Sequence, residues 1–133
     1  MSQANVEFVR AGYAKAGGLG SDIAPDAEFD LTDLYPDQPV LRGIDALRRF
    51  REEGPWGGSR LHFEPERFFD VDEERVLVFV RVTATGRESG VPVEIQGAHE
   101  MTIRDGLIVR FKVFSNRDLA LEAVGLRQSS PGD

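Results

Sequence analysis

The stretch from Arg75 to Phe114 constrains the fold most, because it is typical of three consecutive strands joined by tight turns. β-Branched residues dominate residues 76–82, and two further strands are expected over residues 91–103 and 107–114. Arg104-Asp105-Gly106 lies between the last two and is typical of a hairpin loop. The chain before Gly58 is instead typical of helices, loops and one short strand. Helices followed by such strands predict an α+β fold, in which a curved, largely antiparallel mixed sheet wraps around the N-terminal helices and encloses a pocket.

Three helices are expected around these strands. Apolar residues recur at helical spacing over residues 6–16, and again over residues 43–53. Gly54 and the proline after it are a typical helix stop. Asn116 is a typical N-cap for a short last helix over residues 117–124.

Two more strands are expected before the three consecutive ones. Residues 27–32 alternate as a half-buried strand does, and Glu28 and Asp30 share one side. Residues 61–71 form the next strand, and Pro65 inside it indicates an edge position or a bulge. The segment between residues 33 and 42 holds two prolines and is expected to be a loop.

The register of the last hairpin follows if its loop has three residues with Gly106 at positive φ. His99 would then face Phe111, Met101 would face Val109, and Glu100 would face Arg110, with Ala98 opposite Lys112 and Ile103 opposite Leu107. This register puts His99 on an otherwise apolar inner face, and the opposite-charge pair on the outer face.

The strand over residues 76–82 is apolar on both faces. Its valines share one face, and Leu77 and Phe79 share the other. One of these faces would cover the helices, and the other must be covered too. A homodimer through the sheet face is therefore expected.

Length and composition limit the classes of protein that are possible. A chain of 133 residues is expected to form a single domain over residues 1–126, followed by a polar tail over residues 127–133. The net charge of −7 disfavours nucleic acid as a partner, because an acidic surface repels phosphates. The absence of cysteine excludes disulfides and thiolate catalysis.

Other compositional features concern location and metals. No apolar run approaches the length of a membrane span, so the protein is expected to be cytoplasmic and to have no membrane partner. His62 and His99 are distant in sequence and no His-x-His is present, so no metal site is expected.

Four segments carry a resemblance to a known family: residues 9–14 (VRAGYA), 41–47 (LRGIDAL), 104–109 (RDGLIV) and 119–126 (LALEAVGL). Together they resemble the SnoaL-like branch of the NTF2-like superfamily, whose fold is a cystatin-like α+β cone. The resemblance covers nearly the whole chain. It is specific for fold and weak for function, because this superfamily holds isomerases, cyclases and modules without catalysis.

The resemblance implies a conical pocket for a small hydrophobic molecule that carries a carbonyl or hydroxyl group, with no cofactor. Two hypotheses follow from it. The protein is an enzyme, similar to ketosteroid isomerase or to polyketide cyclases, that acts by acid–base chemistry alpha to a carbonyl. Alternatively, it is a ligand-binding or dimerisation module without turnover.

The same resemblance implies roles for three residues. Tyr13 and His99 would polarise the oxygen of the substrate, and Asp30 would move the proton. Each also has a purely structural interpretation: Tyr13 and His99 as core residues bonded to the backbone, and Asp30 as part of a solvated strand face. If Asp30 points away from the pocket, the binding module is favoured.

Seven further residues are expected around the pocket. Arg81 could neutralise an anionic ligand or lie at the rim of the dimer, and Trp56 could form a lid or pack beneath its loop. The full predicted set is Val9, Glu28, Trp56, Arg81, Met101, Phe111 and Val113.

Overall fold

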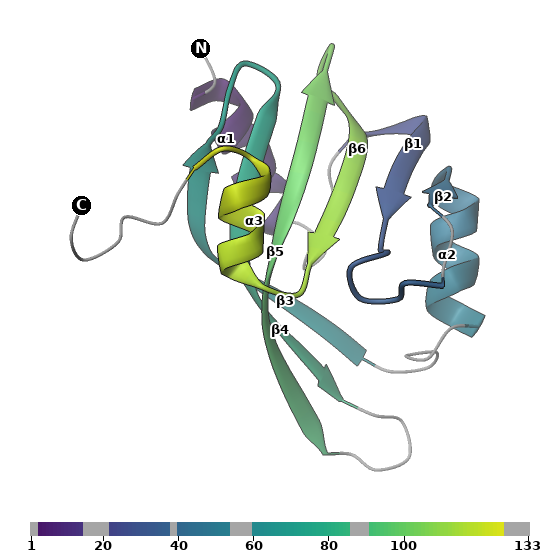
Figure 1. Cartoon of the computed structure of the whole chain (residues 1–133). Helices are drawn as coiled ribbons and strands as arrows, with labels where there is room; N and C mark the ends of the chain where they lie inside the picture. Colours follow the sequence, from purple (N-terminus) through teal and green to yellow (C-terminus); the bar gives the residue numbers. More distant parts are fainter. Residues whose placement is uncertain (1–2, 15–21, 38–39, 54–59, 86–90, 127–133) are drawn as a thin grey trace, which may run out of the picture.

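The chain folds into one curved sheet with helices on both of its faces, as the computed structural model shows (Figure 1). The structure describes residues 3–14, 22–37, 40–53, 60–85 and 91–126. Within these residues the elements are α1 (Gln3–Ala14), β1 (Ile23–Asp30), β2 (Leu41–Arg42), α2 (Ile44–Glu53), β3 (Arg60–Asp70), β4 (Arg75–Thr85), β5 (Pro92–Arg104), β6 (Leu107–Phe114) and α3 (Arg117–Ala123). The predicted α+β class is confirmed.

The six described strands are ordered β2-β1-β6-β5-β4-β3, and only β1 and β6 run parallel among them. The three consecutive strands predicted from the sequence are confirmed as β4, β5 and β6. β3 lies at the edge of the sheet, and its register with β4 shifts between Pro65 and Arg67. Both expectations for Pro65 therefore hold, because proline cannot donate to a neighbouring strand.

Two details of the first half of the chain differ from the prediction. β1 begins at Ile23 rather than at residue 27, and its pairing with β6 is irregular between Ile23 and Glu28, around Pro25. Residues 41 and 42 form β2, whereas this segment was expected to be a loop. A strand of two residues is too short to show alternation, which is why the pattern missed it.

The predicted register of the β5–β6 hairpin is wrong. The loop has two residues, Asp105 at φ 52° and Gly106 at φ 76°, rather than three. An irregularity next to Thr102 then adds one residue to β6. Beyond it, the register differs from the predicted one by two residues, so each side chain points to the predicted face of the sheet. His99, Met101 and Phe111 therefore share the inner face as predicted, but with different partners. The observed pairs include Ala98 with Phe114, His99 with Val113, Glu100 with Lys112, Met101 with Phe111, Ile103 with Ile108 and Arg104 with Leu107.

Apolar side chains gather into one cluster on each face of the sheet. On the inner face, α1 packs its apolar stripe against the valines of β4. On the outer face, Ala120 and Leu121 of α3 pack over Leu77, which is fully buried. α3 thus provides the cover that Leu77 requires within a single chain. A homodimer through this face stays a prediction.

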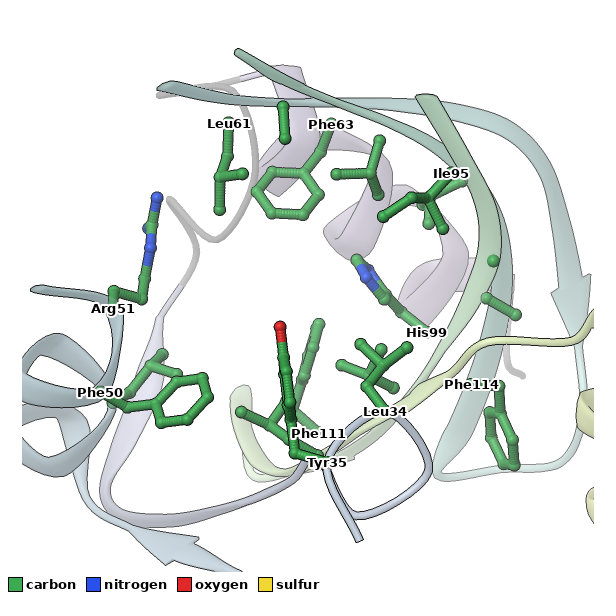
Figure 2. A pocket seen from close by; sticks show the side chains of 18 of the residues that line it. Leu34, Tyr35, Phe50, Arg51, Leu61, Phe63, Ile95, His99, Phe111 and Phe114 are labelled. Carbon is green, nitrogen blue, oxygen red and sulfur yellow. The ribbon is translucent and has the colours of Figure 1, made fainter. Parts of the chain in front are cut away.

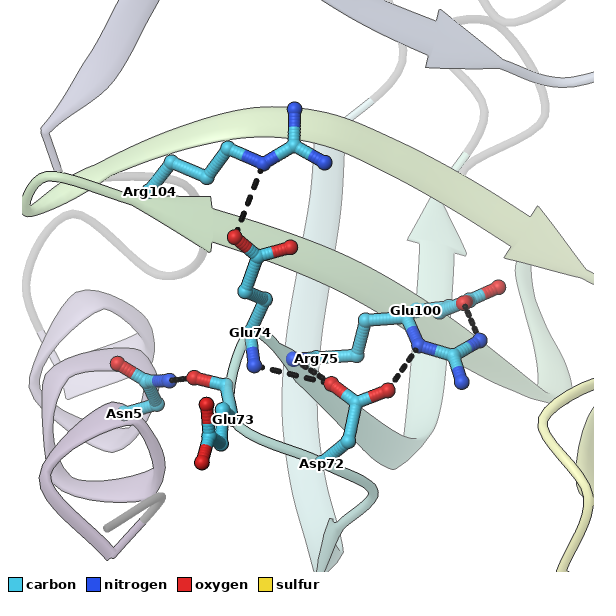
Figure 3. Close-up of polar contacts among 7 residues, drawn as sticks. All are labelled: Asn5, Asp72, Glu73, Glu74, Arg75, Glu100 and Arg104. Atoms are coloured by element: carbon cyan, nitrogen blue, oxygen red, sulfur yellow. Dashed lines mark hydrogen bonds and ion pairs between the residues drawn. The ribbon is translucent and has the colours of Figure 1, made fainter.

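The turn between β3 and β4 is fixed by charged side chains (Figure 3). One carboxylate oxygen of Asp72 accepts from two backbone N–H groups in the turn, and the other binds the Arg75 guanidinium at 2.8 Å. Arg75 also reaches the buried carboxylate of Glu100 on β5 at 3.1 Å. Asn5 on α1 donates to the Glu73 carbonyl at 2.7 Å. The turn thereby links α1 to the centre of the sheet.

Gly97 allows β5 and β6 to approach closely. A Cβ atom at this position would lie 2.6 Å from the carbonyl oxygen of Phe114, which belongs to the backbone and cannot rotate away. We expect Gly97→Ala to lower the free energy of unfolding by about 1–3 kcal/mol, because the strands must shift apart. Urea unfolding measures this loss. Gln96→Ala, at the exposed neighbouring position, should change stability by no more than about 0.5 kcal/mol, and equal effects would contradict the argument.

The predicted role of Trp56 and the predicted polar tail over residues 127–133 concern residues that lie outside the described part of the chain. Among the helices that the structure does describe, none combines the length and the apolar character needed to cross a bilayer.

Candidate functional site

A cavity of about 730 Å³ opens on the inner face of the sheet, beside α2 (Figure 2). Its walls come from alternate residues of neighbouring strands, because side chains with a period of two face the same side. Val80 and Val82 of β4 and Phe63 of β3 are typical wall residues. The charged side chains of Arg51 and Glu52 on α2 are exposed, and they mark where the cavity meets solvent. The hollow is thus apolar inside and charged at one edge.

Tyr13 and His99 form a buried pair at the inner end of the cavity. The Tyr13 hydroxyl oxygen lies 2.6 Å from His99 Nδ1, and the two side chains belong to residues that are 5% and 4% exposed. α1 presents Tyr13 from its apolar stripe, and β5 presents His99 from its inner face. The imidazole is also packed against the ring of Phe111, with 4.6 Å between centroids. Packing on several sides fixes the orientation of the pair.

Burial keeps both members of this pair uncharged. It lowers the pKa of His99 from 6.5 to about 3, and it raises the pKa of Tyr13 well above its usual value of 10. At neutral pH the phenol therefore keeps its proton, and the imidazole carries one proton on one of its two nitrogens. If Tyr13 donates to Nδ1, as we assign, the proton of the imidazole is on Nε2.

Since Tyr13 occupies Nδ1, Nε2 is the ring nitrogen of His99 that is left for a ligand. His99 lines the cavity, Figure 2 shows its imidazole projecting toward the hollow, and no hydrogen bond to Nε2 occurs in the described part of the chain. A ring nitrogen with a proton, in apolar surroundings, is a strong donor to a carbonyl or enolate oxygen. The pair can thus bind one oxygen of a ligand, and it interacts more strongly if that oxygen becomes negatively charged.

Sequence reasoning missed Tyr35, which lies in the segment after β1. Its backbone N–H donates to the carbonyl of Leu31 at 2.9 Å, and its ring packs edge-on against Phe50 of α2, with 5.4 Å between centroids. Its hydroxyl points into the hollow (Figure 2). The available signal was Leu34-Tyr35, an apolar pair within a proline-containing loop, where polar residues are more typical.

Asp30 does not reach the cavity, so the expectation that it moves a proton there is not supported by its position. Its neighbours along β1 point inward, and Asp30 itself lies on the opposite face. Its carboxylate accepts from the Thr32 hydroxyl at 2.6 Å, and it pairs with Arg110 at 3.3 Å and Lys112 at 3.9 Å. Burial raises the pKa of Asp30, but the Thr32 hydrogen bonds and the two cations outweigh it and lower that pKa below its ordinary value.

Two other predicted pocket residues also lie outside the cavity. Glu28 shares the outer face with Asp30 and forms an ion pair with Arg42 at 2.6 Å. Arg81 alternates with the inward-facing valines of β4, and it pairs with the carboxylates of Glu64 and Glu66 on β3. Neither belongs to the residues that line the cavity. Strand alternation explains both positions, because a neighbour of an inward side chain faces outward.

The remaining predicted residues divide between core and wall. Val9 and Met101 are almost completely buried in the inner cluster and do not line the cavity. Phe111 and Val113 do line it. No group of three potential metal-ligating side chains occurs within the described residues.

Comparisons with known proteins agree with this architecture. Residues 10–111 match the family model of the SnoaL-like domain. No curated protein matches the chain. Among solved structures, TerC co-crystallised with polyporic acid is 23% identical, with a TM-score of 0.62 over 93% of this chain and 98% of that one.

Two further solved structures are similar. The epoxide hydrolase/cyclase-like enzyme SalBIII, which has a role in pyran ring formation in the polyether salinomycin, is 18% identical, with a TM-score of 0.67 over 88% of this chain and 95% of that one. An NTF2-like protein from Burkholderia pseudomallei is 16% identical, with a TM-score of 0.61 over 92% and 96%. At these identities the similarity shows a shared fold, and the predicted NTF2-like cone is confirmed.

Proposed function

Because the chain belongs to the SnoaL-like family, we propose that its cavity binds a small, mostly hydrophobic molecule that carries a carbonyl or hydroxyl group. The cavity carries this proposal: about 730 Å³ is within the range of small-molecule sites, and its walls are apolar. His99 Nε2 supplies the polar contact that such sites use to orient a ligand. Specificity would come from this hydrogen bond, and affinity from the buried apolar surface.

A second candidate is a cofactor-independent isomerase or cyclase. The Tyr13–His99 pair favours it, because a fixed donor in a dry cavity stabilises negative charge that develops on a carbonyl oxygen. A base must then remove a proton from the adjacent carbon. Asp30 is held on the outer face, and the cavity residues in the described part of the chain offer one carboxylate, Glu52 at the exposed edge. Ligand binding is therefore the function that the geometry supports best.

Binding can be tested by thermal unfolding in the presence of hydrophobic ketones, phenols and polyporic acid, the last because a structurally similar protein was crystallised with it. A ligand at a hundred times its dissociation constant should add about 2.7 kcal/mol to the free energy of unfolding. The double variant Tyr13→Phe/His99→Phe keeps two rings but removes the hydrogen-bonding atoms. We expect it to weaken binding by about ten-fold, the equivalent of one hydrogen bond.

The matched control is Arg81→Gln, because Arg81 is a polar residue of the same sheet that faces away from the cavity. Its affinity for each ligand should equal that of the wild type. The proposal is wrong if no compound stabilises the wild-type protein, or if the double variant binds every compound as tightly as the wild type does.

A further inference from the structure

Tyr35 presents a second hydrogen-bonding group to the cavity. Its ring is half-buried and held by Phe50, and its backbone is held by Leu31, so the hydroxyl has little freedom to move away. Within the described residues no side chain or backbone group hydrogen-bonds this hydroxyl. Figure 2 shows its oxygen directed toward the centre of the hollow. A fixed and unoccupied phenol in an apolar cavity is available to a ligand.

The hydroxyl of Tyr35 and the imidazole of His99 enter the hollow from different walls. Tyr35 comes from the segment after β1, beside α2, whereas His99 comes from β5 with Tyr13 behind it. Apolar side chains such as Phe63 and Phe111 line the same cavity. Because the two groups come from different walls of one cavity, a ligand with two oxygens can bind both at once.

We propose that Tyr35 and His99 form a two-point clamp, and that the cavity prefers apolar molecules with two oxygen functions over otherwise identical molecules with one. This inference rests on the proposed function and names its ligand class: diketones, hydroxyketones and hydroxyquinones. His99 Nε2 binds the first oxygen, and the Tyr35 hydroxyl binds the second as donor or acceptor.

The preference has a physical cause beyond the added hydrogen bond. A ligand with one oxygen displaces water from the Tyr35 hydroxyl and leaves this group unpaired against an apolar surface. A site that hydrogen-bonds a polar group of its ligand strongly disfavours an analogue without that group. An apolar pocket discriminates much less between ligands that differ only in size. The expected preference is about ten-fold or more in the dissociation constant.

Calorimetric titration with two matched pairs of probes tests the clamp. 1-Tetralone and 4-hydroxy-1-tetralone differ by one hydroxyl group, as do 4-acetylbiphenyl and 4-acetyl-4′-hydroxybiphenyl, and the two pairs separate their oxygens by different distances. We expect the wild type to prefer the second member of at least one pair by about ten-fold. Tyr35→Phe keeps the contact with Phe50, and it should remove this preference without weakening binding of the first member.

Two controls separate this effect from damage to the fold. Without ligand, Tyr35→Phe should unfold like the wild type, because its hydroxyl has no partner among the described residues. Tyr13→Phe removes the only other tyrosine of the chain. It acts through His99, so it should weaken both members of a pair alike and preserve their ratio.

The outcomes distinguish the clamp from the proposed function. If the wild type binds these probes but shows no preference in either pair, or if Tyr35→Phe keeps the preference, the clamp is wrong and the binding function stands. If the wild type binds no probe of either pair and no compound of the broader panel, the proposed function fails and the clamp fails with it.

Discussion

Lowering the pH from 7 to 5 should remove about 2 kcal/mol of stability through His99 alone. Burial lowers the pKa of this side chain from 6.5 to about 3 in the folded protein. As the pH falls below 6.5, His99 binds a proton in the unfolded chain but not in the folded chain, so protonation favours unfolding. The loss approaches about 1.4 kcal/mol per pH unit until the folded pKa is reached, and it amounts to roughly 4–5 kcal/mol over the whole interval.

Urea unfolding at several pH values between 7 and 5 measures this loss, at pH values where most carboxylates stay ionised. The double variant Tyr13→Phe/His99→Phe lacks the titrating group and should lose much less stability across the same range. The exposed His62 is the only other histidine of the chain, and His62→Gln should keep the loss that His99 causes. A wild-type stability that is constant between pH 7 and 5 would mean that the pKa of His99 is the same in the folded and unfolded states.

The second large effect is expected for Phe111→Ala, which should lower the free energy of unfolding by about 3–5 kcal/mol. Phe111 is 4% exposed, and its ring packs against His99 at 4.6 Å and against Phe29 at 6.2 Å between centroids. Removing the ring loses its buried apolar surface and leaves a void beside the imidazole. Because the void joins the existing cavity, the surrounding side chains cannot move in far enough to fill it.

Phe111→Leu is the control for this substitution, since it retains most of the apolar volume and should cost clearly less than the alanine variant. Chemical unfolding of both variants gives the comparison. A cost below about 1 kcal/mol for Phe111→Ala would mean that the ring is not part of the core. In that case the wall of the cavity would have to be assigned to other residues.

Alternation along the strands was enough to predict which of His99, Met101 and Phe111 lie on the inner face of the last hairpin. Two errors in the predicted geometry cancelled: the loop is one residue shorter, and the irregularity near Thr102 adds one residue. His99 and Phe111 therefore stay on the inner face although their partners changed. The face to which a side chain points is unchanged by any even shift of the register. The residue opposite it on the next strand depends on the length of the turn and on bulges, which sequence patterns indicate poorly.

The same rule applies to the acidic residues of β1. Phe29 alternates with Glu28 and Asp30, so an inward Phe29 requires both carboxylates to face outward. The family resemblance suggested a proton-transfer role for Asp30, and the alternation argued against it. Tyr35 could not be predicted in the same way, because a loop has no periodicity and its side chains are directed by contacts such as the one with Phe50.

The parallel pairing of β1 with β6 also affects how the protein is made. Asp30 and Arg110, which pair across these strands, are 80 positions apart in the sequence. During synthesis on the ribosome, β1 leaves the exit tunnel long before its neighbour, and it has only the two-residue β2 beside it in the meantime. Its open edge stays unpaired until the last hairpin has been synthesised, so completion of this sheet is a late step of folding.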